Sequence, residues 1–209
     1  LNRKWIGIDI TYQSISLILK RLEEHFGKAL VDSVSLNGVP KDLESAVALA
    51  NKKDDRTRKE FEKWSILTFS DNKAIVHEKK GGDKGIDGLS FILDKNDKDE
   101  PITREVIFSV KSDKKLAPSV VRDLNGTIER ENAAMGYLIT LYPMDNLVKE
   151  SKQYGMYENS WFRRRYPKIE IVSVNDIFNG RRMDLPISVD ILKKAEHKRI
   201  SNQKPLDLK

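Results

Sequence analysis

The spacing of hydrophobic and polar residues predicts a chain built from both helices and strands. Helical patterns occupy residues 15–26, 41–53, 56–69, 118–132, 145–155 and 174–179. Apolar runs and alternation predict strands over 4–10, 31–36, 74–76, 88–93, 105–111, 136–141 and 169–173. From residue 56 onward the order is helix, three strands, helix, strand, helix, strand. That order is typical of an α/β domain with a mixed sheet, in which 88–93 and 105–111 form a hairpin.

Turn and charge signals divide the chain into four parts. The turn residues of Asn37–Pro40 and the charged stretch Lys52–Lys59 place a soft boundary between about residues 30 and 55. We therefore expect an N-terminal piece at 1–30, a linker with a short strand and a helix at 31–54, the main domain at 55–186, and a basic tail at 187–209. The first residue is Leu and a predicted strand follows almost at once, so we expect the chain to be a fragment of a longer protein.

Composition narrows the possible chemistry. The 209 residues include no cysteine, which excludes a disulfide scaffold, a zinc ribbon and thiol catalysis. No run approaches the roughly 18 apolar residues of a membrane span, and no signal peptide is visible, so we expect a cytoplasmic protein without membrane contact. The formal net charge is +6, from 38 Lys and Arg against 32 Asp and Glu. This charge permits a nucleic-acid partner but does not establish one.

One pair of residues carries candidate chemistry. Asp87 stands at a loop-to-strand junction, and Lys111 lies near the end of the next long strand. In a hairpin the start of one strand lies near the end of the next, so the two side chains can meet and hold a divalent metal and a phosphate. Glu62 could supply a second carboxylate and the backbone carbonyl of Val110 a further oxygen. From spacing alone the alternative stays open that Asp87 is a turn residue and Lys111 a solvated strand end.

Four blocks follow one another in the main domain, namely Gly81–Gly88, Val106–Lys111, Val121–Gly126 and Gly136–Thr140. In this order they resemble the Mrr-like restriction endonuclease domain of the PD-(D/E)xK nuclease superfamily, over roughly residues 55–185. Glu60–Trp64 looks like the helix that precedes the site in that family. The resemblance implies a restriction-endonuclease-like mixed sheet flanked by helices. It also implies hydrolysis of DNA phosphodiester bonds with Mg²⁺ or Mn²⁺, double-stranded DNA as partner and a prokaryotic source. Residues 1–30 could fold by packing on this domain or by pairing with a second copy in a homodimer, because an exposed apolar strand edge favours either arrangement.

The family pattern can be carried over residue by residue. Asp87 matches the metal-binding aspartate, Lys111 matches the lysine of the (D/E)xK element, and Glu62 matches the helix glutamate, with Glu60 as the alternative. Ser109 stands where the pattern has Glu, Asp or Gln, and serine is a poor metal ligand. An alternative function is therefore a catalytically inert nuclease fold that grips DNA to assist a methyltransferase in cis.

The N-terminus carries a second resemblance. Asn2–Ile10, followed by a helix, is similar to the late part of amino-methyltransferases that act on DNA adenine or cytosine. In those enzymes the acid at the strand end, here Asp9, binds the ribose hydroxyls of S-adenosylmethionine. The glycine loop and the Asp-Pro-Pro-Tyr-type motif are absent from this sequence, so we expect no methyl transfer and favour Asp9 as a simple strand-end acid. The chain would be the C-terminal fragment of a methyltransferase-associated restriction–modification protein, with a βα remnant of a Rossmann-like domain.

Basic residues supply candidate DNA contacts, since phosphate contacts provide most non-specific affinity. The candidates are Lys80, Lys84, Lys114, Arg122, Arg163 and Arg164. For the lysines of the glycine-rich loop, the alternative is a solvated loop. Arg122 could instead pair with Asp123 or Glu129, and the arginines near Trp161 could be a solvated rim.

Overall fold

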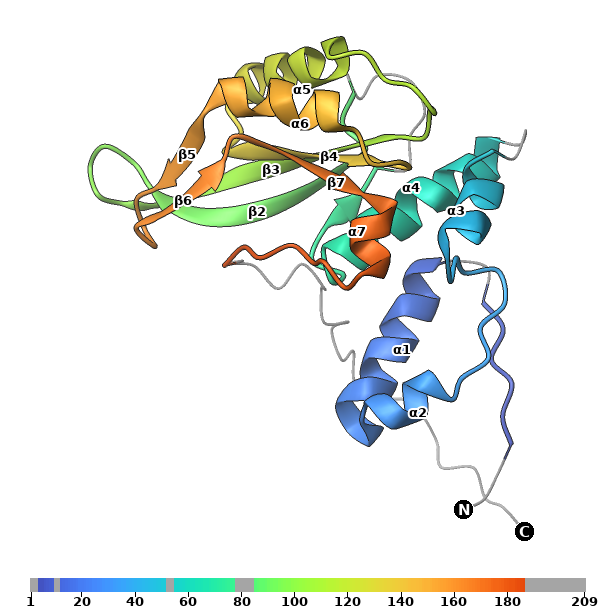
Figure 1. The fold of residues 1–209 in the computed structure, drawn as a ribbon. Helices are drawn as coiled ribbons and strands as arrows, with labels where there is room; N and C mark the ends of the chain where they lie inside the picture. The colour runs from blue at the N-terminus through green and yellow to red at the C-terminus, as the bar shows by residue number, and fades with distance from the viewer. Residues whose placement is uncertain (1–3, 10–11, 52–54, 78–84, 187–209) are drawn as a thin grey trace, which may run out of the picture.

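The computed structural model describes residues 4–9, 12–51, 55–77 and 85–186 (Figure 1). Its centre is a five-stranded sheet with the order β1-β2-β3-β4-β7. The strands are β1 (Ile75–Val76), β2 (Gly88–Lys95), β3 (Pro101–Lys111), β4 (Met135–Thr140) and β7 (Ile169–Ser173). β1, β2 and β3 pair antiparallel, whereas β3–β4 and β4–β7 pair parallel. The predicted mixed α/β sheet is confirmed.

Helices connect the parallel strands and cover both faces of the sheet (Figure 1). α5 (Ser119–Arg130) joins β3 to β4, and α6 (Asp145–Ser151) with the 3-10 turn η1 (Lys152–Tyr154) follows β4. α4 (Asp55–Phe69) precedes β1, α7 (Val174–Phe178) follows β7, and α3 (Leu43–Ala50) packs against α4 and α7. β5 (Met156–Asn159) and β6 (Arg164–Pro167) form a separate hairpin between η1 and β7.

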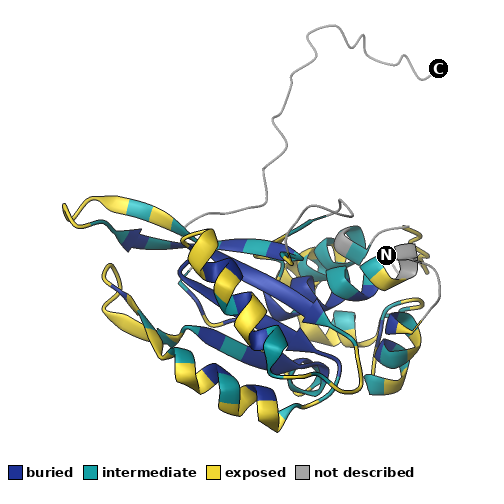
Figure 2. Cartoon of the chain, turned by 90° about the horizontal axis from the view of Figure 1, so that it is seen from above, coloured by how far each residue is buried: buried dark blue, intermediate teal, exposed yellow. Residues whose placement is uncertain are grey.

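The alternation of side chains along β3 and β4 creates two cores. Phe108 and Tyr137 stack at 5.4 Å on the face that α3, α4 and α7 cover, together with Phe69. Ile107 and Leu138 point to the other face and pack under α5 and α6. Figure 2 shows the result as a buried sheet between helices whose outer sides are exposed. Both faces of β3 and β4 are therefore occupied, and only the strand ends are free to carry chemistry.

The N-terminal helices pack onto this domain through α4. α1 (Tyr12–Phe26) and α2 (Lys28–Asp32) lie below the sheet in Figure 1. Side-chain contacts join α1 to the end of α4 and the turn after it, namely Tyr12–Thr68 at 2.6 Å, Ser16–Asn72 at 2.8 Å and Lys20–Asp71 at 3.7 Å. Residues 12–20 thus pack on the main domain, which is one of the two arrangements expected for the N-terminal piece.

Two expected strands are wrong, and one hairpin was missed. Residues 4–9 have no regular structure, because none of the described strands pairs with them, and Ile6 and Ile8 are 90% and 91% exposed. Residue 10 lies outside the described residues. The strand expected over 31–36 is replaced by the end of α2 and a loop. Of the expected βα remnant, only the helix is therefore formed in the described residues. β5 and β6 form where no strand was predicted.

No helix within the described residues is long and apolar enough to span a membrane. The basic tail expected at 187–209 lies outside the described residues.

Candidate active site

Asp87 lies where the chain enters β2, and the neighbouring strand fixes its backbone. Its N–H donates to the carbonyl oxygen of Phe108 at 2.9 Å. Gly88 pairs with Phe108 across the hairpin, and side chains alternate between the two faces of a strand. Asp87 therefore shares one face with Ser109 and Lys111, at the end of the sheet where β2 begins and β3 ends.

The Asp87 carboxylate is held against the backbone of β3. Its Oδ2 accepts a hydrogen bond from the N–H of Val110 at 2.7 Å. The N–H and C=O of one strand residue point to the same side, so the carbonyl oxygen of Val110 also faces the Asp87 side. The carbonyl of Lys111 faces away and accepts from Leu141 in the chain beyond β4 at 3.1 Å. A carboxylate and a backbone oxygen thus lie together at this strand end.

The glycine after Asp87 lets helix α4 pack directly on the start of β2. A Cβ at Gly88 would lie 3.1 Å from the carbonyl oxygen of Ile75 and 3.2 Å from Cδ1 of Ile66. Such contacts are tighter than normal packing, so a larger residue would push the helix away. Ile66 follows Glu62 by one helical turn, and this close approach brings Glu62 to the Asp87 end of the sheet.

Of the two candidate glutamates, only Glu62 interacts with Asp87 and Lys111. The charges of both residues act on the carboxyl of Glu62. Glu60 instead forms an ion pair with Lys63, with 3.1 Å between Nζ and Oε1. The structure therefore brings together Asp87, Glu62 and Lys111, and turns Glu60 to the side of the helix.

Burial and mutual repulsion shape the electrostatics of this cluster. Burial raises the pKa of Asp87 above its ordinary value, although the Val110 N–H, the charges of Lys111 and Lys59, and a hydrogen bond with Ser109 oppose the increase. The pKa of Glu62 is raised as well, first by burial and then by the charge of Asp87. The ionised forms of these two neighbouring carboxylates are disfavoured, and a bound divalent cation would stabilise them.

Sequence reasoning missed one member of the cluster, Lys59. Its Nζ donates to the carbonyl oxygen of His77 at 3.1 Å and lies 4.0 Å from Oε2 of Glu62. Lys59 also lowers the pKa of Asp87. The available signal was its position three residues before Glu62, which places both on one helical face.

The donor set suits a hard cation. The carboxylates of Asp87 and Glu62 and the carbonyl of Val110 are oxygen ligands, which Mg²⁺ and Mn²⁺ prefer. Among the described residues, no group of three or more His, Cys, Asp or Glu could hold a metal. Ser109 is 4% exposed, and its side chain lowers the pKa of Asp87. It adds no charge at the position where the family pattern has Glu, Asp or Gln.

The raised pKa values predict how the stability of the metal-free protein depends on pH. For an acid whose folded pKa lies above its unfolded value, stability is fully present below the unfolded pKa and is lost as pH rises through the folded pKa. Those unfolded values are close to 3.8 for Asp87 and 4.5 for Glu62. We expect the double variant Asp87→Asn/Glu62→Gln to melt a few degrees higher than the parent at pH 7 in EDTA. The difference should shrink toward pH 4, as measured by thermal denaturation; a difference that grows on acidification would contradict this electrostatic account.

The candidate DNA contacts do not all lie near this cluster. Lys114 is exposed in the loop after β3. Lys80 and Lys84 lie outside the described residues. Arg122 pairs with Glu150 at 3.0 Å, rather than with Asp123 or Glu129, and stays 57% exposed.

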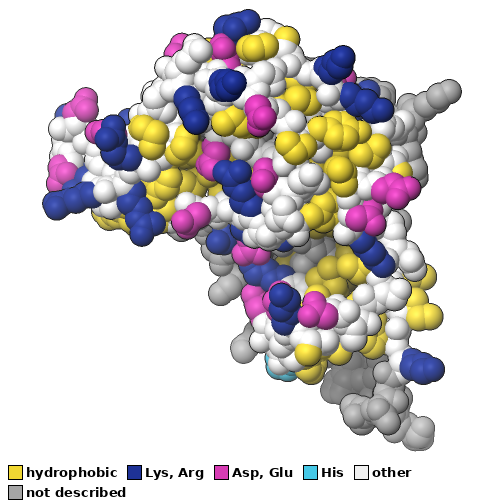
Figure 3. All heavy atoms as spheres, in the orientation of Figure 1, with side chains coloured by type: hydrophobic (Ala, Val, Ile, Leu, Met, Phe, Trp, Pro, Cys, Tyr) yellow, Lys and Arg dark blue, Asp and Glu magenta, His cyan; other side chains and the backbone are white. Residues whose placement is uncertain are grey.

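Arg163 and Arg164 lie at the other end of the sheet, on the β5–β6 hairpin. Asn159 in this hairpin donates to the carbonyl oxygen of Leu93, near the end of β2. Leu93 is six strand residues, or about 20 Å, away from Asp87. Figure 3 shows basic side chains gathered at that end, with acidic side chains among them. The two arginines therefore do not face the Asp87 cluster.

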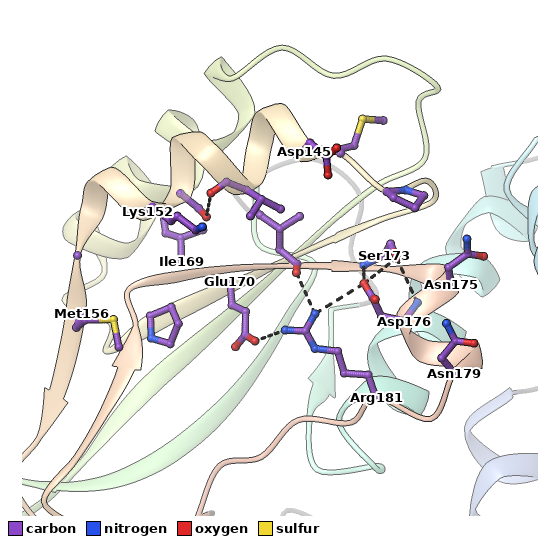
Figure 4. Close-up of a pocket in the computed structure, with 17 residues that line it drawn as sticks. Asp145, Lys152, Met156, Ile169, Glu170, Ser173, Asn175, Asp176, Asn179 and Arg181 are labelled. Carbon is purple, nitrogen blue, oxygen red and sulfur yellow. Dashed lines mark hydrogen bonds and ion pairs between the residues drawn. The ribbon is translucent and has the colours of Figure 1, made fainter.

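A cavity of about 820 Å³ lies apart from the Asp87 cluster, beside the edge strand β7. Its walls come from α6, β7 and α7 (Figure 4). Arg181 crosses its floor and pairs with Glu170 and with Asp176. Neither Asp87, Glu62 nor Lys111 lines this cavity, so it does not belong to the cluster at the end of β2 and β3.

Comparison with known proteins agrees with the architecture of the domain. Residues 54–156, just under half of the chain, match the Mrr_cat family, described as restriction endonuclease. No match was found among curated proteins or among solved structures. The matched segment runs from α4 to the start of β5 and includes Glu62, Asp87 and Lys111. Residues 54–156 therefore resemble a restriction endonuclease domain and have the mixed sheet and flanking helices of that fold.

Proposed function

We propose that this domain hydrolyses phosphodiester bonds of double-stranded DNA with Mg²⁺ or Mn²⁺ as cofactor. The observation that carries the proposal is the cluster of Asp87, Glu62 and Lys111 at one end of β2 and β3. Two half-buried carboxylates with raised pKa values beside a lysine form an arrangement typical of a functional site, because such a group costs stability when no ligand is bound.

Each residue of the cluster has a defined task in this proposal. Asp87, Glu62 and the carbonyl oxygen of Val110 would hold the cation. The cation would supply Lewis-acid polarisation of the scissile phosphate and a bound water of lowered pKa. Lys111 places a positive charge beside Asp87, where negative charge develops on the phosphate in the transition state. The Ser109 side chain favours the ionised form of the Asp87 carboxyl.

The DNA backbone would reach this cluster along the loops on either side of it. Lys114 is exposed just beyond Lys111 and can contact a phosphate next to the scissile one. Lys80 and Lys84 come from the loop that precedes Asp87 in the sequence. These contacts would position the DNA without reading its sequence, so they do not define a recognition sequence.

A second candidate function is an inert DNA-binding module that assists a methyltransferase. Ser109 favours this reading, because it is buried and gives no charged oxygen to a cation at the position where the family pattern has an acid. A metal site with one carboxylate fewer binds its cation more weakly. The two functions therefore differ in whether the cluster binds Mg²⁺ or Mn²⁺ at all.

Metal titration tests the proposed function directly. We expect the protein to bind Mn²⁺ or Mg²⁺ at millimolar concentration in isothermal titration calorimetry, and to melt at a higher temperature when the cation is present. Asp87→Asn should remove both effects. Glu60→Gln is the matched control, since it removes a carboxylate of the same helix that pairs with Lys63 instead. Absence of any binding by the parent protein would favour the inert module.

Two further proposals rest on the sequence resemblance alone. Association with a DNA methyltransferase is implied by residues 2–10, of which the described part forms no strand. Asp9 lies in that exposed segment, so cofactor binding at Asp9 would require the remainder of a methyltransferase domain. A prokaryotic source is likewise inferred from the family resemblance, whereas a homodimer through the N-terminal piece and a cytoplasmic setting are inferred from the sequence itself.

A further inference from the structure

A second cavity, of about 460 Å³, is rich in arginine and has no role in the proposed cleavage. It lies between β4, β6, β7 and the segment that follows α7. Four arginines line it, namely Arg164, Arg165, Arg181 and Arg182. The acids that line it are Glu170 and Asp184. The excess of positive charge in a concave site points to an anionic ligand.

Two of these arginines are already neutralised. Arg165 pairs with Glu158 across the β5–β6 hairpin at 3.0 Å. Arg181 pairs with Glu170 and lies 3.7 Å from Asp176, as Figure 4 shows. These ion pairs fix the walls of the cavity but leave no charge for a ligand. The available charge must come from the other two arginines.

Arg182 and Arg164 keep their positive charge. Arg182 donates from Nη1 to the carbonyl oxygens of Ile177 and Arg181, both at 2.8 Å. These neutral acceptors orient the guanidinium without compensating it, and its remaining N–H groups stay available. Within the described part of the chain, no carboxylate pairs with Arg164 or Arg182.

Tyrosine hydroxyls complete the set of donors. Arg164 and Tyr166 share one face of β6, because they are two residues apart in a strand. The hydroxyl of Tyr166 is buried and has no hydrogen-bond partner among the described residues. Tyr137 also lines the cavity, and its pKa is raised by burial and by the nearby charge of Glu170. The Tyr137 phenol is therefore protonated at neutral pH and can donate, and the hydroxyl of Tyr166 supplies a second O–H donor.

We propose that this cavity binds the phosphate group of a nucleotide, with Arg164, Arg182, Tyr137 and Tyr166 as donors. Two guanidinium groups and two hydroxyls offer more hydrogen-bond donors than the two oxygens of a carboxylate need. A phosphate group has more acceptor oxygens and therefore fits this set of donors better. A bound phosphate would also satisfy the Tyr166 hydroxyl, which otherwise is an unpaired buried group. The volume leaves room for an attached nucleoside. The phosphate belongs either to a free nucleotide or to the DNA backbone.

Binding measurements without divalent metal test the site independently of cleavage at Asp87. Calorimetry would use inorganic phosphate and deoxyadenosine monophosphate, and fluorescence anisotropy would use a short labelled DNA duplex. We expect Arg164→Gln to weaken phosphate binding about tenfold and Tyr166→Phe about fivefold. Arg21→Gln is the matched control, because it removes one exposed arginine of α1 that does not line the cavity. That control should change affinity less than twofold.

The outcomes separate the two sources of phosphate. Loss of mononucleotide binding in both variants indicates a free nucleotide, whereas loss of duplex binding alone indicates a backbone phosphate. In the unliganded protein, Tyr166→Phe should raise the melting temperature, because it removes an unpaired buried hydroxyl. This separates ligand binding from a folding defect. The proposal is wrong if Arg164→Gln and Tyr166→Phe bind both the nucleotide and the duplex as tightly as Arg21→Gln does.

Discussion

Lys111→Ala is expected to lower the rate of Mg²⁺-dependent plasmid cleavage by about 10²- to 10³-fold, the usual cost of removing one preorganised charge from a transition state. Lys111 ends β3 on the sheet face of Asp87, and its charge acts on both Asp87 and Glu62. The measurement is single-turnover cleavage of supercoiled plasmid with protein in excess. This design keeps DNA binding saturated, so the rate reports the chemical step alone.

Asp87→Asn should cost at least as much, because it removes a carboxylate that would hold the cation. Asparagine is the better replacement than alanine, since its carbonyl oxygen can still accept the hydrogen bond from Val110. The backbone at the strand end is then preserved. Circular dichroism and DNA binding in EDTA should match the parent protein.

The matched control is Lys114→Ala. This lysine is exposed three residues beyond Lys111, in the loop after β3. Loss of one phosphate contact should weaken DNA binding and reduce by about one the slope of log affinity against log salt concentration. The single-turnover rate at saturating protein should stay unchanged. If the double variant Asp87→Asn/Lys111→Ala cuts plasmid as fast as the parent, the assignment of the active site is wrong.

The sheet could be predicted from sequence because its strands have strong local patterns. β3, β4 and β7 are apolar runs with both faces buried, and the pattern in the sequence carries that information directly. The β5–β6 hairpin could not be predicted in this way, since its strands are short and its exposed residues are mainly polar. Its position depends on hydrogen bonds with β2 residues that lie 66 positions earlier in the chain.

The predicted strand over 4–10 shows the opposite error. Residues 4–10 have the apolar pattern of a strand, but a strand requires a neighbour with free hydrogen-bonding groups. In the described chain the segment 4–9 has no such neighbour, and Ile6 and Ile8 face solvent. Local pattern alone therefore predicted an element that tertiary structure does not complete.

The candidate site was predictable to the extent that it follows from topology. A hairpin places the start of one strand near the end of the next, so the order of elements alone predicted that Asp87 and Lys111 lie close together. The choice between Glu62 and Glu60 required the packing of α4, which depends on the contact between Ile66 and Gly88. The contribution of Lys59 depends in addition on where His77 presents its carbonyl oxygen.

The second large effect concerns stability. Asp94→Asn is expected to lower the free energy of unfolding by about 3 kcal/mol at pH 7, as for removal of one member of a buried ion pair. Asp94 is 3% exposed and lies 3.3 Å from Nε of Arg104. It accepts hydrogen bonds from the Tyr157 hydroxyl and from the N–H of Ser160. The carboxylate thus joins β2 and β3 to the β5–β6 hairpin, and an amide cannot satisfy the same donors.

The pH dependence of this loss distinguishes the charge of Asp94 from its shape. Burial alone would raise the pKa of Asp94, but the hydrogen bond from Tyr157, two backbone N–H groups and the charge of Arg104 outweigh burial and lower it below 3.8. Stability from such a group is present above the unfolded pKa and is lost as pH falls through the folded pKa. Urea denaturation should therefore show the full difference between parent and variant at pH 7 and a smaller one below about pH 4.

Asp99→Asn provides the comparison that decides whether this anchor matters. Asp99 lies at the tip of the same β2–β3 hairpin, and its carboxylate pairs with Lys95 at 2.7 Å with 80% of its side chain exposed. An exposed ion pair is worth less than about 1 kcal/mol, so this variant should unfold nearly like the parent. Equal losses in the two variants would mean that the buried carboxylate does not hold the hairpin. A loss confined to Asp94→Asn would show that one buried charge positions β6, and with it Arg164 and Tyr166 of the arginine-rich cavity.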